Sequence, residues 1–265
     1  GRLGDAAKQK LASDINVAIM NVAANQGTLF VKRTAAASGF DDVAQCEAIM
    51  NEQGVPMYDR YLALSTRDYN GMASDLSKAS RSFGNEISDK ALRKAFVGEM
   101  ASFGTYKLDY ANRKTAAAGG GSLTVDTRAA AGNYYAPKAT SVATTGETAN
   151  VDNRFQTITI SSTTSVVAGD AFTIAGLNAV HHITKGDTGQ LKTFRVISVP
   201  TSTTLVISPP IISNQGGSDA EAQYQNVVVN TAASNSAIVF LNTFTNFINP
   251  FWMRDSLEIL PGRYA

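Results

Sequence analysis

Residues 151–174 read VDNRFQTITISSTTSVVAGDAFTI, and this stretch decides the fold class of the middle of the chain. Apolar and polar side chains alternate over Phe155–Ile160, and a second apolar run, Ala171–Ile174, follows the turn Ala168-Gly169-Asp170. Alternation with a period of two places one set of side chains on each face of a strand. Short β-branched runs between Gly, Asp and Ser are typical of a small sandwich or barrel. The stretch therefore predicts two strands of an all-β region.

Three further runs of the same kind follow it, namely FRVISV at 194–199, TLVIS at 204–208 and VVV at 227–229. This part of the chain is also poor in charge, since only 13 of the 45 charged residues lie in 115–250, whereas 28 lie in 1–114. The change of composition falls at the small-residue stretch TAAAGGG at 115–121, which indicates a domain boundary. A polar stretch at about 136–150 has no pattern of its own and is predicted to be a long loop.

The residues before this boundary have helical periodicity. Leu11, Ile15, Ile19, Val22 and Ala23 recur at spacings of three and four, which predicts an amphipathic helix over about 5–26. A second helix is expected at 41–53, capped by Ser38 or Asp41, with three residues on its buried face: Val43, Cys46 and Met50. The further expected elements are a strand at 60–65, helices at 66–79 and 89–97 (the latter capped by Ser88), and a strand at 103–109.

The last part of the chain resembles the first part in its residue composition. An apolar run at 238–241 ends before Asn249-Pro250, and residues 251–260 are expected to form a strand in which Phe251 and Trp252 are buried anchors. The simplest architecture is therefore an α+β domain interrupted by an inserted all-β barrel or sandwich, because an insertion with neighbouring ends fits at a surface loop.

Composition narrows the functional classes. The 265 residues carry a formal net charge of +1, whereas nucleic-acid binders are usually basic, and no apolar run is long enough to span a membrane. The single cysteine, Cys46, excludes an intrachain disulfide and is expected to be a small buried hydrophobe. The absence of a visible signal peptide, together with this cysteine usage, points to a reducing, cytosolic origin.

No residue pattern predicts a catalytic, metal or cofactor site. His181 and His182 are the only histidines, and adjacent residues of a strand point to opposite faces, so they are not expected to chelate one metal. No GxSxG elbow is present, and Gly119–Ser122 lacks the GK[ST] ending of a phosphate loop, so this stretch is interpreted as a hinge. The basic pairs Lys32-Arg33 and Arg93-Lys94 are interpreted as solvated charge.

Several segments nevertheless form a recognisable set: VDNRF at 151–155, AGDAFTIAG at 168–176, TKGDTGQLKTFRV at 184–196 and NPFW at 249–252. Together they closely resemble the coat proteins of phage P22 and its relatives, and the resemblance covers most of the chain. The residues at the centre of these motifs are Asp152, Asn153, Arg154, Phe155, Phe194, Phe251 and Trp252.

The resemblance implies a capsid fold of the Hong Kong ninety-seven type. Residues 1–38 would be the end of the spine helix and its connection in the peripheral domain. Residues 39–118 would form the first part of the axial domain, 119–245 the inserted β-domain, and 246–265 the return strand of the axial domain. An N-terminal arm and extended loop would precede residue 1, and the rest of the axial domain would follow residue 265.

The function implied by the resemblance is structural and not enzymatic. The chain would be a subunit of an icosahedral bacteriophage or prophage capsid, assembling as hexamers and pentamers in the bacterial cytoplasm with a scaffolding protein. The shell would enclose double-stranded DNA through weak contacts, with no cofactor, membrane or small-molecule substrate.

The resemblance also implies two functional loops in the β-domain. By position, a loop that reaches a neighbouring capsomer corresponds to 137–150, where Lys138 and Glu147 are the only charges, so its contact is expected to depend little on salt. The second loop would be 181–192, with Lys185, Asp187 and Lys192 as its charged residues.

Two other classes of protein remain open at this point. The Ser/Thr-rich β-region favours a bacterial surface or adhesin module, which would be expected to carry calcium loops of the DxDxD kind; the sequence contains none. A hydrolase with a diffuse site would be expected to place a carboxylate near His181 or His182 in a deep pocket.

Overall fold

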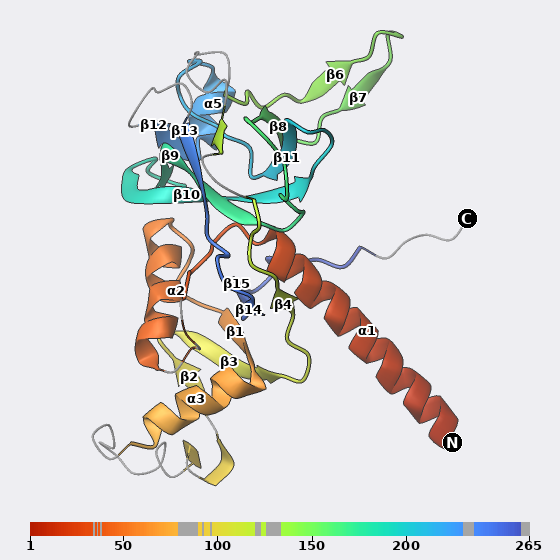
Figure 1. Ribbon diagram of the computed structural model, residues 1–265, viewed down its shortest axis with the longest axis vertical. Coiled ribbons are helices and arrows are strands. Elements are labelled where there is room, and N and C mark those ends of the chain that lie inside the picture. Colours follow the sequence, from red (N-terminus) through yellow and green to blue (C-terminus); the bar gives the residue numbers. More distant parts are fainter. Residues whose placement is uncertain are drawn as a thin grey trace.

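The computed structural model has two main β-sheets, one formed by the middle of the sequence and one by the segments on either side of it (Figure 1). The structure describes residues 1–33, 35, 37, 39–78, 90–91, 93–95, 97–119, 123–125, 134–229 and 236–260. Among these residues, no helix combines the length and the apolar character needed to cross a membrane.

The middle of the chain forms a seven-stranded sheet. Its strands are β5 (Thr124–Val125), β8 (Gln156–Thr159), β9 (Ala171–Val180), β10 (Asp187–Ser198), β11 (Thr204–Ser208), β12 (Val227–Val229) and β13 (Ser236–Phe240). The strand order is β5-β13-β9-β10-β11-β8, and β12 also pairs with β9. A bridge between Val125 and Ile160 joins the two ends of this order, so the sheet curls into a near-closed barrel. The predicted all-β region is confirmed as this barrel.

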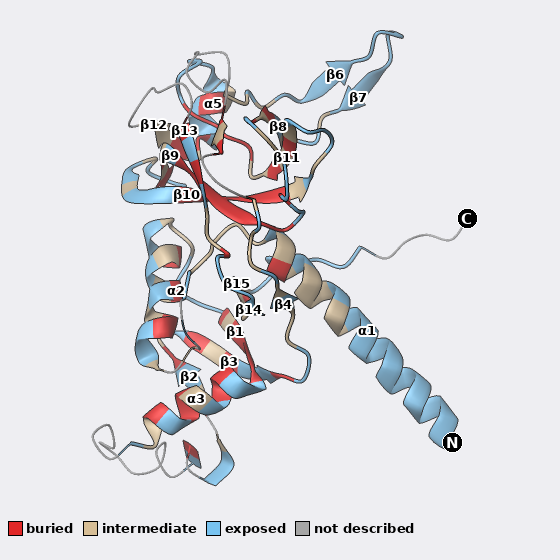
Figure 2. Cartoon of the chain, viewed as in Figure 1, coloured by how far each residue is buried: buried red, intermediate tan, exposed pale blue. Residues whose placement is uncertain are grey.

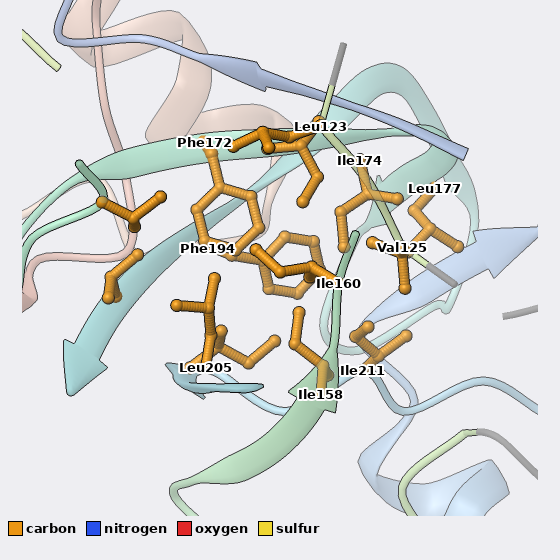
Figure 3. Packing of buried hydrophobic residues seen from close by; sticks show 14 of the residues in the cluster. Leu123, Val125, Ile158, Ile160, Phe172, Ile174, Leu177, Phe194, Leu205 and Ile211 are labelled. Atoms are coloured by element: carbon orange, nitrogen blue, oxygen red, sulfur yellow. The ribbon is translucent and has the colours of Figure 1, made fainter. Parts of the chain in front are cut away.

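The barrel interior holds the larger of the two apolar cores. Figure 3 shows Phe172, Ile174, Phe194 and Leu205 from three runs of sequence meeting inside it, and all four are fully buried. The rings of Phe172 and Phe194 lie 5.9 Å apart between centroids. Burying each such side chain contributes about 1.5–3 kcal/mol. This is why the alternating runs of the sequence, which supply one inward side chain at every second position, end up as barrel strands.

The flanks of the sequence form a four-stranded sheet. In it, β1 (Arg60–Ser65) pairs in parallel with β3 (Phe103–Leu108) and antiparallel with β15 (Phe251–Met253), and β2 (Glu99–Met100) lies at the far edge. Helices α2 (Phe40–Glu52) and α3 (Thr66–Leu76) cover one face. The chain that leaves the barrel therefore returns to the strand it formed before entering it.

The two faces of this sheet differ in burial. Leu62, Leu64 and Phe103 are buried in one cluster with residues of α2 and α3. Figure 2 shows buried stretches in β1, α2 and α3. Trp252 lies on the opposite face, where it packs beside Tyr61 with ring centroids 6.1 Å apart, and it is only half-buried. The prediction of Trp252 as a buried anchor was therefore wrong, because Trp252 packs beside Tyr61 outside the core cluster of α2 and α3, whereas Phe251 is half-buried against Phe103 and that core.

The elements predicted for the first region are largely confirmed. The expected helices at 41–53 and 66–79 correspond to α2 and α3, and the expected strands at 60–65 and 103–109 correspond to β1 and β3. The caps differ, since α2 begins after Gly39, whose N–H donates to Asp42. Much of the predicted helix at 89–97, with its cap Ser88, lies outside the described residues, as does Ser38.

Helix α1 (Arg2–Gln26) has the predicted period but not the expected burial. It projects from the rest of the chain, and of its residues only Ala24 is buried (Figures 1 and 2). Leu11, Ile15 and Val22 of the predicted apolar stripe are exposed. The periodicity therefore identified the helix correctly, but three of the five residues of its predicted apolar stripe are exposed, and Ile19 and Ala23 are half-buried.

Three smaller features were not predicted, and one predicted strand is shorter than expected. Residues 136–150, expected to be a loop, contain the hairpin β6 (Thr140–Val142) and β7 (Thr148–Asn150), which projects from the barrel (Figure 1). A short helix, α5 (Asp219–Tyr224), carries a capping box between Ser218 and Glu221. A two-stranded sheet joins β4 (Arg113–Lys114) to β14 (Asn246–Phe247), and the expected strand at 251–260 is limited to β15.

Candidate functional site

The hairpin β6–β7 is the most protruding part of the barrel. Its strands pair from Thr140 with Asn150 to Val142 with Thr148, and every residue of 138–150 is exposed. This pairing places Lys138 at the base and Glu147 in the tip, where the Glu147 carboxylate accepts from the Thr145 hydroxyl at 3.4 Å. The two predicted charged residues therefore lie at opposite ends of the hairpin.

The VDNRF motif forms the base of this hairpin. Asn153 bonds to both Tyr135 and Lys138. Asp152 and Arg154 form an exposed ion pair, 2.7 Å between Oδ2 and Nη2, and the hydrogen bonds from Arg154 lower the pKa of Asp152 to about 2. The Arg154 guanidinium lies 5.2 Å from the centre of the half-buried Phe155 ring. Asp152 and Arg154 are thus surface residues, whereas Phe194 of the second motif is fully buried.

The second predicted loop is shorter than expected. The turn covers 181–186, and strand β10 begins at Asp187. Lys185 reaches the Gln225 carbonyl at 3.2 Å, and its burial lowers its pKa. Asp187 accepts from Asn178 Nδ2 at 3.1 Å and from the Gly189 N–H at 2.8 Å. Lys192 was wrongly assigned to this loop, because it is a buried residue of β10.

Strand β10 attaches the barrel to the C-terminal end of helix α1. The buried Arg195 guanidinium donates to the Ala24 carbonyl in α1 and, at 3.2 Å, to the Gly27 carbonyl just beyond this helix. It also donates to the Gly169 carbonyl of the barrel at 2.8 Å. A cation is favourable where unpaired carbonyls end a helix. Burial lowers the pKa of Arg195 to about 10, so the guanidinium stays charged at neutral pH. Lys114 Nζ bridges the same junction, since it donates to the Ala168 carbonyl of the barrel at 3.1 Å and to Asn25 Oδ1 of α1 at 3.4 Å.

The same strand and the turn before it attach the barrel to the end of helix α2. The Gln53 carbonyl accepts from the His182 N–H at 3.2 Å, and Lys192 Nζ donates to Gln53 Oε1 at 3.2 Å. Gly54, with a φ of +83°, lies against the rings of His181 and His182. Burial lowers the pKa of Lys192 to about 8. Sequence reasoning missed these contacts, although a lysine and an arginine inside the apolar strand LKTFRV were a usable signal.

His181 and His182 take part in this contact with α2, and their side chains do not point to opposite faces of a strand. They follow the end of β9, so their rings stack on one side with centroids 5.7 Å apart, which corrects the expectation of opposite faces. His181 Nδ1 lies 3.3 Å from the N–H groups of Ile183 and Thr184, both of which donate to it. Over the described part of the chain, no three His, Cys, Asp or Glu side chains come together as metal ligands do.

Asn242 holds together the two chain segments that connect the barrel with the four-stranded sheet, one entering the barrel and one leaving it. Its side chain donates to Asp170 Oδ1 at 3.0 Å and to the Thr115 carbonyl at 3.3 Å, and it accepts from the Ala171 N–H at 3.0 Å. The Asn242 carbonyl accepts from Ala117 at 2.7 Å. Asp170 and Asn242 are both buried, so the entering and leaving chains are held side by side by a satisfied polar network.

A hollow of about 590 Å³ lies between the end of α1, helix α2 and the segment that leads to β15. Its walls are mostly apolar. Its two carboxylates are engaged in structural bonds: Asp42 pairs with Arg33 at 2.6 Å, and Asp68 accepts from Ser65 and Asn249. These groups therefore serve the fold, and they do not form an acid–base pair.

Comparison with known proteins places the chain in a family and relates part of it to a solved structure. The family model of the P22 coat protein, gene protein 5, matches residues 1–264. Among solved structures, the chain is similar to the CUS-3 coat protein I-domain, with 41% identity over 46% of this chain and 96% of that chain and a TM-score of 0.33. Because the family model extends over all but the last residue, the chain belongs to the P22 coat protein family.

Proposed function

We propose that this chain is a structural subunit of the icosahedral capsid of a tailed bacteriophage. The observation that carries the proposal is the match to the coat protein family over 1–264. Copies of the chain would assemble as hexamers and pentamers into a shell that encloses double-stranded DNA. Many weak symmetric contacts add up through multivalency, so no single contact needs to be strong. The role is structural, and no catalytic step is assigned.

The fold is proposed to be of the Hong Kong ninety-seven type. Residues 1–38, which contain α1, would be the end of the spine helix and its connection, and 39–118 with 246–265 would belong to the axial domain. Residues 119–245 would be the inserted β-domain. The antiparallel pairing of β15 with β1 supports this division, because the chain returns to the first sheet after the barrel.

The partners and place of assembly follow from the same role. We propose that the subunits assemble in the cytoplasm of the bacterial host on a scaffolding protein and then reside in the virion. The net charge of +1 supports weak rather than tight contact with the packaged DNA.

The hairpin β6–β7 is proposed to be the contact between neighbouring capsomers. An isolated two-stranded hairpin is marginally stable in water, and this one is exposed along its whole length, which favours a partner surface. Lys138 and Glu147 are its only charges, so the contact would depend mainly on backbone and apolar groups. The loop around Lys185 and Asp187 is the second candidate contact.

The proposal is tested by co-expressing the full coat gene with its neighbouring scaffolding gene and separating the lysate on a sucrose gradient. We expect the chain in rapidly sedimenting particles in both low and high salt. Recovery of the chain only at the top of the gradient, with scaffolding protein present, would contradict the capsid role.

A further inference from the structure

We propose that Asn153 is the positioning residue that sets the direction of the β6–β7 hairpin, and that this direction is what lets the hairpin reach a second copy of the chain. The inference rests on the proposed capsid function and adds to it the residue on which the contact depends. It also gives a role to the VDNRF motif.

The hairpin cannot fix its own direction. Its two strands pair only with each other, and all residues of 138–150 are exposed, so no side chain of the hairpin anchors it on the barrel. The direction must therefore be set where the two chains enter and leave, at residues 135–138 and 151–153.

Asn153 joins these two chains with three hydrogen bonds. Its Oδ1 accepts from the Tyr135 hydroxyl at 2.7 Å and from the Lys138 N–H at 3.0 Å, and its Nδ2 donates to the Lys138 carbonyl at 2.7 Å. The side chain thus engages both main-chain groups of Lys138, which fixes a peptide orientation as well as a distance. An amide supplies both a donor and an acceptor, whereas a carboxylate would lose the donor and face the Lys138 carbonyl with a charge.

The entering chain is in turn fixed to the barrel. The Tyr135 N–H donates to the Ile211 carbonyl at 2.9 Å, and Tyr134 packs against the barrel core. Next to Asn153, the Arg154 N–H donates to Asp152 Oδ1 at 3.0 Å, which restrains the backbone on the leaving side. A continuous set of bonds therefore runs from Ile211 through Tyr135 and Asn153 to the first residue of the hairpin.

The positioning role is tested by measuring the hairpin's direction in the 265-residue chain. Spin labels on Thr144→Cys in the tip and Ser202→Cys on the barrel report the distance between them, and the native Cys46 is buried and will not compete. The variants are Asn153→Ala and Asn153→Asp. The matched control is Asn150→Ala, an exposed asparagine of β7 on the same hairpin. Tyr135→Phe removes only one of the three bonds and serves as a mild variant if the others fold poorly.

We expect one narrow distance distribution for the unmodified chain and for Asn150→Ala, a broad one for both Asn153 variants, and an intermediate width for Tyr135→Phe. An unchanged narrow distribution in the Asn153 variants would overturn the positioning role.

The consequence for assembly is tested in the full coat protein with its scaffolding protein. We expect Asn153→Ala to lower the shell yield at least about tenfold relative to Asn150→Ala, since a small loss per contact is multiplied over many contacts. A broad hairpin distribution together with a normal shell yield would refute the link to assembly. If the unmodified protein forms no shells, the capsid role itself fails, while the distance measurement still decides the role of Asn153.

Discussion

At the scale of single residues, Arg195 shows how the barrel and helix α1 are held together. One guanidinium donates to the carbonyls of Ala24 and Gly27 at the end of α1 and to the carbonyl of Gly169, which lies far away in the sequence. Because the group is fully buried, water cannot replace these bonds when the side chain is removed. The stability of the junction is therefore concentrated in this residue.

Replacing Arg195 with Met should destabilise the chain by about 3–5 kcal/mol, because two buried carbonyls and one part-buried carbonyl lose a charged donor. The measurement is the free energy of unfolding in urea, followed by circular dichroism. Arg254→Met is the control, since Arg254 is largely exposed and should give an unchanged midpoint. A midpoint for Arg195→Met equal to that of the control would contradict the role of the junction.

Because of Lys192, the stability of the chain is expected to change with pH in the alkaline range. Its pKa in the folded chain is about 8, below the ordinary 10.5, because burial penalises the charged form. Between pH 8 and 10.5 the unfolded chain holds a proton that the folded chain has lost, so the free energy of unfolding rises with pH in this window, by about 3 kcal/mol at most.

Lys192→Met should remove that rise and increase stability at pH 7, where the unmodified chain buries a charge. Urea unfolding of both proteins at pH 7, 9 and 10 measures the difference, and other titrating groups cancel between them. Identical pH slopes for the two proteins would show that Lys192 keeps its ordinary pKa.

The sequence predicted the burial of single residues well where burial follows from the periodicity of apolar residues. It predicted burial poorly where this depends on a partner far away in the sequence. Cys46 was expected to be a small buried hydrophobe and is buried, which raises the pKa of its thiol to about 12. Trp252 was expected to be buried but is only half-buried, beside Tyr61 and outside the core cluster of α2 and α3. The stacking of His181 with His182 depends on where β9 ends, and residue types alone do not fix that boundary.

At the scale of elements, the end of helix α2 is a contact point as well as a helix terminus. Gly54 ends the helix with a φ of +83°, and a Cβ there would lie 2.7 Å from atoms of His181 and His182. Close approach of the barrel therefore requires glycine here for two separate reasons, backbone conformation and space.

These reasons can be separated with two substitutions. Gly54→Ala and Gly146→Ala both place alanine at a φ near +85°, at a cost of about 1 kcal/mol, but Gly146 has nothing within 4 Å of its would-be Cβ. Gly54→Ala should therefore lower the melting temperature clearly more than Gly146→Ala. Equal shifts in thermal unfolding would mean that α2 and the barrel do not pack closely at this point.

Apart from α1, the elements that the sequence predicted are those whose apolar residues contact a core. Helix α2 and strands β1, β8 and β11 follow this rule. The hairpin β6–β7 was missed because its Thr, Ser and Ala residues contact no core and so show no alternation. Helix α5 was missed although its capping box, Ser218 to Glu221, is visible in the sequence.

At the scale of the whole molecule, the composition of the sequence located the barrel but not its attachment. The drop in charge after residue 114 marks the change from the flanking sheet to the barrel. The contacts that join the two, through Lys192 to α2 and Arg195 to α1, link residues more than 100 positions apart. Such pairings depend on the finished fold and have no local pattern, so only the structure reveals them.

The central claim, that this member of the P22 coat protein family builds a capsid, also concerns the whole molecule. Its exposed hairpin and the exposed apolar residues of α1 are surfaces suited to neighbouring subunits. In an assembled shell these surfaces would be covered, and the barrel would hold the hairpin in a fixed direction.

The most direct test is electron microscopy of the full coat gene product made together with its neighbouring scaffolding protein. The account predicts closed shells of uniform diameter. Repeated preparations that contain only soluble monomers, with the scaffolding protein present, would contradict it.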